Sequence, residues 1–471
     1  GCTILRELTL PAQLGDLQSW QVYGCTALEA IHVEDGNLSV QSKDGILYSA
    51  DGTELLLCPA GRSGHVTVPA GTERIDGDAF ARCVLITGVT LPDTVREIGP
   101  GAFSQCTSLT TVNLSDNISE LQGRAFAGCV SLEQVQIPEQ TWRLKAGTFE
   151  DCRSLTSVTL PEGLWFLDER CLAGCEGLEE ITIPFDVRGV DGDALADCAS
   201  LTDIYVQAGN VHYRSVDGVL YSADGSTLVR YPPGRKGEFT IPPDVTDIEE
   251  RAFSGSDGLT GLAIPPTVTN LGGYAFVGCE NLEWVSTPAT VDLIPYQTFR
   301  DCPSLSRVTM ANGVKEIQRM AFGFCTSLRR IVLPDSVIEV DADVFLGCES
   351  LDSVMMVGDA PWYPCQIPRF LGDAEPTIYF GRLSIGWGRF FGRQPTATWP
   401  ELSSPRWESG SFWGTVIADQ GTAFEVQRCR DIATGEWETV AVGTAQEGDL
   451  TPFSDAVAPE ERRGCYRVVL P

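Results

Sequence analysis

The chain has 471 residues, more than one ordinary hydrophobic core accommodates, so we expect several domains or an elongated array. Its formal net charge of −31 would be repelled by nucleic acids and by anionic lipid surfaces, which excludes both as partners. No apolar run reaches the roughly 20 residues of a transmembrane helix, so no membrane insertion is expected. The chain opens at Gly1 in the middle of a repeated segment, as expected of a mature form or a trimmed fragment.

Cysteines recur along the chain with a fixed spacing of 23 residues. The step from Cys83 to Cys106 is repeated as far as Cys198, and it resumes after Ser256 and continues to Cys348. A constant period between about 20 and 50 residues predicts a stacked array, in which each unit buries its apolar face only against its neighbours. The cysteines at this shared position are Cys2, Cys25, Cys83, Cys106, Cys129, Cys152, Cys175, Cys198, Cys279, Cys302, Cys325 and Cys348.

Each 23-residue unit carries the same pattern of apolar residues. Shortly after the cysteine, apolar residues alternate with polar ones, as in Val112-Asn113-Leu114, and this predicts a short strand with one buried face. A proline often follows and ends the strand. An Ala-Phe pair closes the unit, and the short segment from this pair to the next cysteine is expected to form a single helical or 3₁₀ turn. The pattern therefore predicts a β-rich solenoid of short strands and helical turns.

The pattern CxxLxxVxIPxxVxxIxxxAF, repeated in register, resembles the BspA-type leucine-rich repeat of bacterial and protozoan surface proteins. The resemblance covers residues 1–358, which we assign to a leucine-rich-repeat solenoid. It implies a curved array at the cell surface or in the extracellular space. It also implies adhesion to, or binding of, proteins of a host or of a neighbouring cell.

Two insertions, at about residues 34–68 and 207–241, interrupt the period. Residues 43–64 align with residues 216–237 at an offset of 173, which indicates that one block of the array was duplicated. Each insertion has Ala-Asp-Gly between two apolar runs, such as residues 46–49 and 55–58. This arrangement predicts a β-hairpin, because glycine accepts a positive φ in a tight turn.

Beyond residue 358 the 23-residue step is lost. We expect the aromatic-rich residues 359–400 to cap the solenoid, with strands at residues 377–380 and 396–399. Residues 401–411 are polar and contain Pro and Gly, which predicts a linker.

The C-terminal residues 412–471 have a different pattern. They resemble a small fibronectin-type-III-like module through FEVQR, the Trp after a Gly turn and the final YRV, and the resemblance implies a small all-β, sandwich-like domain. Cys429 and Cys465 either pair across adjacent strands of this module or remain half-buried thiols.

Residues suited to catalysis or to metal binding are scarce. The repeated cysteines are expected to be buried and reduced, because Ser256 replaces one of them without breaking the pattern. No CxxC pair is present, and His32, His65 and His212 join no Ser/His/Asp or Cys/His arrangement. We therefore expect no enzyme activity, no catalytic residue, no metal and no cofactor.

The candidate ligand-binding residues are Trp142, Arg143, Trp165, Phe166 and Arg188. The two tryptophans occupy the same position of consecutive units, so strands about 4.8 Å apart would place the indoles side by side, with arginines close by. Trp and Arg are enriched in binding hot spots, and flat aromatic faces also suit sugar rings. In the alternative interpretation, the indoles only cover the outer face of the solenoid.

A column of threonines on the exposed side of the longer strands is a second candidate surface. It includes Thr90, Thr159 and Thr182. Branched side chains suit a β surface for structural reasons alone, and their hydroxyls also offer hydrogen bonds to a partner.

The sequence thus favours a non-catalytic binding protein that is secreted or held at a cell surface. We expect a monomer whose partner is a protein or glycan of a host or neighbouring cell. Two alternatives stay open: carbohydrate recognition through the exposed aromatic residues, and an accessory scaffold module of a larger secreted enzyme.

Overall fold

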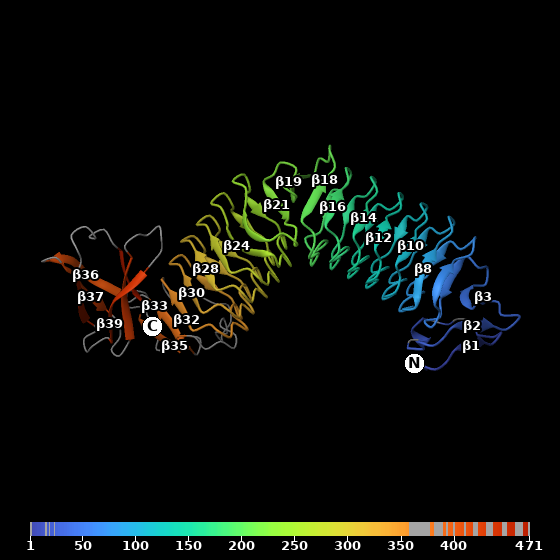
Figure 1. Cartoon of the computed structure of the whole chain (residues 1–471), viewed down its shortest axis with the longest axis horizontal. Helices are drawn as coiled ribbons and strands as arrows, with labels where there is room; N and C mark the ends of the chain where they lie inside the picture. The colour runs from blue at the N-terminus through green and yellow to red at the C-terminus, as the bar shows by residue number, and fades with distance from the viewer. Residues whose placement is uncertain are drawn as a thin grey trace.

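The computed structural model describes residues 2–357 except residues 15, 16, 18 and 23, and beyond them only the backbone of strands between residues 377 and 469. The units stack into an arched solenoid, with the N-terminal units at one foot and β18 (Asp203–Val206) near the apex (Figure 1). Each full unit contributes one longer strand, one short strand and a turn that contains the Ala-Phe pair. The curved repeat array that the spacing predicts is therefore confirmed.

The longer strands follow the repeated cysteine and pair in parallel with the strand of the next unit. In β10, Val112 is the register partner of Val89 in β8, 23 residues earlier. Their buried residues alternate with exposed ones, as in β16, because successive side chains of a strand point to opposite faces. These strands are β1 (Glu7–Leu10), β2 (Ala30–Val33), β6 (Gly64–Thr67), β8 (Ile86–Thr90), β10 (Thr111–Asn113), β12 (Gln134–Gln136), β14 (Ser157–Thr159), β16 (Glu180–Ile183), β18, β22 (Gly237–Thr240), β24 (Leu259–Ala263), β26 (Trp284–Thr287), β28 (Arg307–Met310), β30 (Arg330–Leu333) and β32 (Ser353–Met356).

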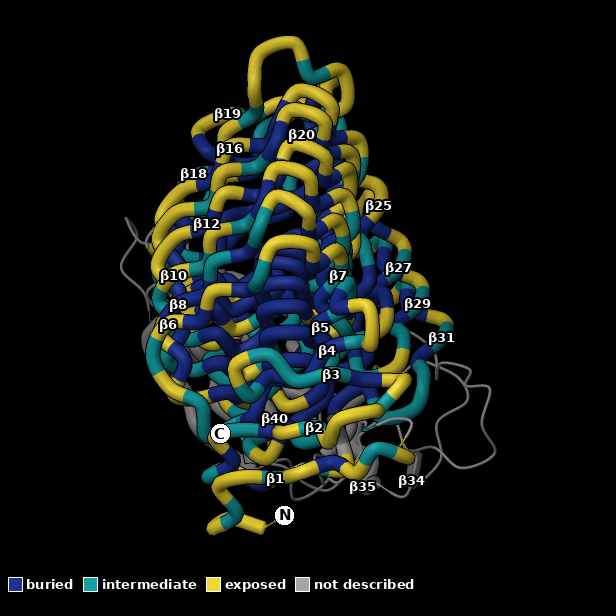
Figure 2. The backbone as a smooth tube through the Cα atoms, turned by 90° about the vertical axis from the view of Figure 1, so that its right-hand side faces the viewer, coloured by how far each residue is buried: buried dark blue, intermediate teal, exposed yellow. Residues whose placement is uncertain are grey.

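The short strands form a second face of the solenoid. Each has two residues, of which the second points into the core and the first points outward, as in β13, where Leu144 is buried and Arg143 is exposed. These strands are β7 (Arg74–Ile75), β9 (Glu97–Ile98), β11 (Glu120–Leu121), β13 (Arg143–Leu144), β15 (Phe166–Leu167), β17 (Gly189–Val190), β23 (Asp247–Ile248), β25 (Asn270–Leu271), β27 (Leu293–Ile294), β29 (Glu316–Ile317) and β31 (Glu339–Val340). Viewed along the array, buried backbone fills the centre between the two faces (Figure 2).

The expected helical turn before each cysteine is wrong. This segment forms non-helical turns, because alternate amides donate to the next unit: Phe103 N donates to Ala125 O and Gln105 N to Ala127 O, each at 2.7 Å. Gln105 also has a φ of 62°, which interrupts a right-handed helix. Within the described part of the chain, the only helix is the 3₁₀ helix η1 (Ser19–Val22).

The repeated phenylalanines form a buried column, as the repeat predicts. Within each half of the array, neighbouring rings stack with centroids 4.6 to 5.7 Å apart. Each ring is 0% exposed, so the aromatic column supplies much of the contact between units. The members are Phe80, Phe103, Phe126, Phe149, Phe253, Phe276, Phe299, Phe322 and Phe345.

The repeated cysteines form a second column beside the phenylalanines. All fourteen cysteines that the structure describes are free, and all except Cys2 are buried. The thiol of Cys129 donates to the carbonyl oxygen of Phe103 in the preceding unit, with 3.1 Å between Sγ and O, and the contact recurs along the array. A buried thiol therefore has a hydrogen-bond partner without any disulfide, which explains why cysteine suits this position.

The two insertions have the same topology. In the first, β3 (Val40–Lys43), β4 (Ile46–Ser49) and β5 (Glu54–Leu57) pair antiparallel in chain order, and β5 then pairs in parallel with β7. In the second, β19 (Tyr213–Val216), β20 (Val219–Ser222) and β21 (Thr227–Arg230) do the same, and β21 pairs with β23. The buried side chains divide into two large clusters that meet at the second insertion, because Leu220 and Val229 belong to one and Val219 and Leu228 to the other.

Beyond residue 357 the structure describes strands alone. β33 (Thr377–Phe380) and β35 (Gln394–Thr398) extend the ladder of β32 in parallel, and β34 (Phe390–Phe391) pairs antiparallel with β35. The capping role of residues 359–400 stays a prediction, because most of these residues lie outside those described.

The expected linker at residues 401–411 contains a strand, β36 (Glu401–Glu408), which pairs antiparallel with β37 (Ser411–Ile417). A register shift between Ser403 and Arg406 accommodates Pro405, which has no amide to donate. The other strands are β38 (Ala423–Cys429), β39 (Trp437–Thr444), β40 (Leu450–Ala456) and β41 (Cys465–Val469).

The C-terminal strands form two antiparallel sheets, in the orders β36-β37-β40 and β39-β38-β41. Cys429 and Cys465 are register partners in β38 and β41. Their pairing and the fibronectin-type-III-like module stay predictions, because the side chains of these strands lie outside the described part. Among the described residues, no helix is both long and apolar enough to span a bilayer.

Candidate ligand-binding site on the short-strand face

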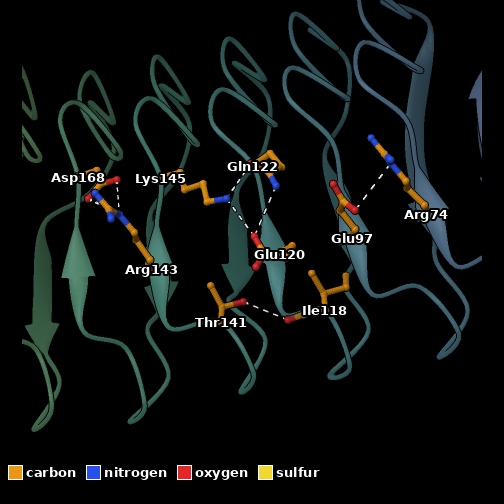
Figure 3. Close-up of polar contacts among 9 residues, drawn as sticks. All are labelled: Arg74, Glu97, Ile118, Glu120, Gln122, Thr141, Arg143, Lys145 and Asp168. Carbon is orange, nitrogen blue, oxygen red and sulfur yellow. Dashed lines mark hydrogen bonds and ion pairs between the residues drawn. The ribbon is translucent and has the colours of Figure 1, made fainter.

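The outward residues of the short strands and the residues that flank them form ladders across the units. Because equivalent residues lie side by side, charges pair between units: Lys145 Nζ lies 3.0 Å from a Glu120 carboxylate oxygen and 2.7 Å from Gln122 Oε1 (Figure 3). Arg74 and Glu97 pair in the same way at 3.8 Å. This face is therefore a regular polar surface, and a departure from its pattern stands out.

The departure occurs at Trp142 and Trp165, which immediately precede β13 and β15. The Trp165 amide donates to the Trp142 carbonyl at 2.8 Å, so the two residues are neighbours across adjacent units. Their ring centroids lie 6.1 Å apart at 66°, an edge-to-face contact. The two residues are 39% and 41% exposed, which makes them an apolar patch on a polar face.

Arginines continue the two aromatic columns. The Arg188 guanidinium carbon lies 3.8 Å from the centroid of Trp165 and 5.7 Å from that of Phe166. Arg143 lies 5.5 Å from the centroid of Phe166. All five residues predicted from the sequence are thus brought together, and we call Trp142, Arg143, Trp165, Phe166 and Arg188 the aromatic face.

A hollow of about 410 Å³ adjoins the aromatic face, with Arg143 and Phe166 in its wall. Phe166 lies over Gly189, where an added Cβ would come within 2.6 Å of the ring, so a glycine is needed there. Three carboxylates, those of Asp168, Glu169 and Asp191, also line the hollow.

One of these carboxylates is already paired with an arginine. Arg143 Nε donates to both oxygens of Asp168, at 2.9 and 2.7 Å (Figure 3). This hydrogen bond, and then the charge of the carboxylate, raises the pKa of Arg143. The hollow therefore combines an aromatic wall with a surplus of negative charge, which suits a cationic group.

The sequence prediction missed the lining of this hollow. Asp168 and Asp191 stand two residues after Phe166 and Gly189, on the same outward side of the short strands. The alternation of side chains in a two-residue strand could have placed them beside the predicted residues.

The threonine column lies on the longer-strand face and also borders a hollow. This hollow measures about 280 Å³, and Thr159, Thr182 and Gln207 are among its lining residues. It lies where the sheet is interrupted, because β14 pairs with β12 and β16 with β18, with no ladder between β14 and β16.

The structure offers little for catalysis within its described residues. No group of three or more His, Cys, Asp and Glu side chains in this part of the chain is placed to hold a metal ion. Burial raises the pKa of the Cys152 and Cys198 thiols to about 12, so the column cysteines are poor nucleophiles at neutral pH. Binding, rather than bond making, is what this arrangement supports.

These observations define a class of protein: a repeat solenoid with buried phenylalanine and cysteine columns and an exposed aromatic and arginine patch. The family model described as "BspA type Leucine rich repeat region (6 copies)" matches residues 73–202 and 236–352, more than half of the chain. The chain therefore belongs to the BspA-type leucine-rich repeat family. A comparison with curated protein sequences finds no match.

Two solved structures illustrate the similarity. A leucine rich cell surface protein of Faecalibacterium prausnitzii A2-165 is 28% identical, with a TM-score of 0.54 over 67% of this chain and 94% of that one. The pneumococcal vaccine antigen PcpA is 19% identical, with a TM-score of 0.53 over 73% of this chain and 91% of that one, and supports the fold alone.

Proposed function

We propose that this chain is a non-catalytic binding protein of the cell surface or the extracellular space, and that it holds a partner protein through the aromatic face. Membership of a leucine-rich repeat family supports protein binding, and the similar protein of Faecalibacterium prausnitzii is a cell surface protein. Adhesion to a host or neighbouring cell is the form of binding that we propose. The observation that carries the site is the half-exposed tryptophan pair flanked by two arginines.

The packing of the arginines favours a protein over a sugar as the ligand. A sugar ring stacks on an open aromatic face, but Arg188 already lies 3.8 Å from the centroid of Trp165. Trp142 contacts the same indole at 66°, so little of its flat surface remains free for stacking. Arg and Trp arranged in this way instead resemble the hot-spot clusters of protein interfaces.

The adjoining hollow favours a partner with basic side chains. Asp168, Glu169 and Asp191 line it, and only Asp168 is engaged by Arg143 in a direct contact given above. A lysine or arginine of the partner would meet the Phe166 ring and these carboxylates together. The formal net charge of −31 adds long-range attraction to a basic protein, and it predicts binding that weakens as salt is raised.

The decisive variant is Trp142→Ala combined with Trp165→Ala. Both residues are about 40% exposed, so the array should stay folded, with an unchanged circular dichroism spectrum. Binding should be measured with the purified chain on arrays of cell-surface proteins and glycans. Loss of a hot-spot pair costs at least about 2 kcal/mol, so affinity for the selected protein should fall by about 30-fold or more.

The matched control is Thr159→Ala combined with Thr182→Ala, on the longer-strand face. This control should bind as the unaltered chain does. If the tryptophan variant binds normally and the threonine variant does not, the aromatic face is the wrong site and the threonine face is the better one. If the unaltered chain selects glycans alone, and the tryptophan variant loses them, the site stands but the ligand class is a carbohydrate.

A further inference from the structure

The two insertions form structurally equivalent joints between blocks of the array. Residues that align at the offset of 173 make the same backbone hydrogen bonds, so the duplication seen in the sequence is preserved in three dimensions. The matched pairs are Cys58 N to Ala79 O (2.7 Å) with Tyr231 N to Ala252 O (2.8 Å), Gly61 N to Leu28 O (2.7 Å) with Gly234 N to Leu201 O (2.8 Å), and Ile31 N to Gly45 O (2.9 Å) with Ile204 N to Gly218 O (2.8 Å).

The second joint is filled by a buried guanidinium group. Arg230, the last residue of β21, is 1% exposed. Its Nη1 donates to Gly192 O at 3.1 Å and to Arg251 O at 2.7 Å, and its Nη2 donates to Leu195 O at 3.1 Å and to Ser254 O at 2.8 Å. Four carbonyl oxygens, two from the preceding unit and two from the following one, thus form a site for a guanidinium group.

The first joint has a hollow at the equivalent place. Leu57 stands where the second joint has Arg230, and it is too short to reach the same carbonyls. A hollow of about 90 Å³ remains, lined by Leu57 and by Val22, Asp78 and Ala81. These last three are the counterparts of Leu195, Arg251 and Ser254, whose carbonyls bind Arg230 in the second joint. We call this space the Leu57 hollow.

We propose that the Leu57 hollow binds the guanidinium group of an arginine side chain on a partner polypeptide. The argument is the internal comparison: the same backbone frame, built from the same stretch of duplicated sequence, already holds a guanidinium group in the second joint. Backbone carbonyls of turns are set by the fold, so they stay in place when the side chain between them is changed.

The surroundings of the Leu57 hollow differ from the second joint in two ways that favour an external ligand. Val22 and Ala81 are half-buried, whereas Leu195 and Ser254 are buried, so the first site is open to solvent. Asp78 replaces Arg251, which exchanges a cation for an anion at the rim.

Other residues at the Leu57 hollow set the chemistry of the ligand. Arg82 also lies at the rim and contributes a positive charge, so charge alone does not define the ligand. Cys25, Leu28 and Cys58 form an apolar wall, which suits the flat faces of a guanidinium better than the compact, strongly hydrated ammonium of lysine. The ligand class is therefore an arginine side chain rather than any cation. This site is separate from the aromatic face.

The test uses the whole chain and a short peptide, acetyl-Gly-Arg-Gly-amide, titrated by calorimetry. One side chain gives weak binding, with a Kd of about 1 mM. The same peptide with lysine or with citrulline, an uncharged isostere of arginine, should bind at least 10-fold more weakly. Leu57→Arg should place a guanidinium in the site, raise Tm and abolish peptide binding, while Leu57→Met should leave both unchanged.

The results that would overturn the proposal are distinct from those that bear on the aromatic face. Equal binding of the lysine peptide, or undiminished binding of the arginine peptide to Leu57→Arg, would remove the case for a guanidinium site. A lowered Tm or failure to fold of Leu57→Arg would have the same meaning, because the carbonyls would then be unable to receive the group. The variant with both Trp142→Ala and Trp165→Ala should keep peptide binding, so the two proposals can fail independently.

Discussion

Replacing Arg230 by leucine tests how the two blocks of the array are joined. The change copies the residue that the chain itself uses at the equivalent position, Leu57, so the backbone frame tolerates leucine there. It removes four hydrogen bonds from a charged donor to Gly192, Leu195, Arg251 and Ser254. Burial lowers the pKa of Arg230, which shows that the charge itself is costly to bury and that the hydrogen bonds must offset this cost.

The magnitude follows from the acceptors that are left behind. The carbonyl of Arg251 also accepts the Ser254 amide at 2.9 Å, so it retains a partner when Arg230 is lost. The other three carbonyls each cost about 1–2 kcal/mol when they are left unsatisfied. Relief from burying the charge and entry of water reduce the total, so we expect the free energy of unfolding to fall by about 3 kcal/mol.

Urea unfolding of Arg230→Leu, followed by circular dichroism and by tryptophan fluorescence, measures this loss. The two buried clusters meet at this joint, so weakening it should also separate the unfolding of the N-terminal and C-terminal blocks into two transitions. Arg214→Leu, an exposed arginine of the same insertion, is the matched control and should change stability by less than about 0.5 kcal/mol. A single transition within about 1 kcal/mol of the unaltered chain would refute the role that we assign to Arg230.

Three further predictions concern the columns and the aromatic face. Phe126→Ala removes a ring that is 0% exposed and stacked on both sides, so the free energy of unfolding should fall by about 3–5 kcal/mol in a denaturant titration; a loss below 1 kcal/mol would contradict the packing argument. Burial raises the pKa of the Cys152 and Cys198 thiols to about 12, above the roughly 8.5 of an unfolded cysteine. The unfolded chain then ionises first, so stability that is complete below about pH 8.5 should decline as the pH rises toward 12, and a flat profile between pH 8 and 11 would count against buried thiols. Gly189→Ala should displace the Phe166 ring, because the new Cβ would lie 2.6 Å from it, and should weaken partner binding while the far-ultraviolet spectrum stays the same; a crystal structure with an unmoved ring would show that the glycine is not needed.

The repeat architecture could be predicted because it depends on residues that every unit shares. Phe126 is buried for the same steric reason in each copy, so repetition reveals its role without any knowledge of the fold. The turn before the cysteine could not be predicted in the same way. Gln105 donates its amide to the next unit, and a single unit read alone does not show whether such a bond competes with a helical one.

The aromatic face was predictable in part for a related reason. Equal spacing places Trp142 beside Trp165 whatever the details of the backbone, and the structure has them in contact. The edge-to-face angle and the carboxylates of the hollow depend on rotamers and on the outward side of a two-residue strand. The spacing of 23 residues carries no information about either, so Asp168 and Asp191 were missed.

The joints show where reading the pattern alone misleads. Arg230 ends the apolar run Thr227-Leu228-Val229, where a pattern reading places a polar residue at the exposed end of a strand. The structure buries it instead, because the insertion leaves a gap between units whose turns present carbonyl oxygens. The duplicated block carries leucine at the same place and keeps a hollow there. The residue at this position therefore decides whether a joint is closed from within the chain or left open to a group from outside. Exchanging Leu57 and Arg230 between the two joints should exchange those properties.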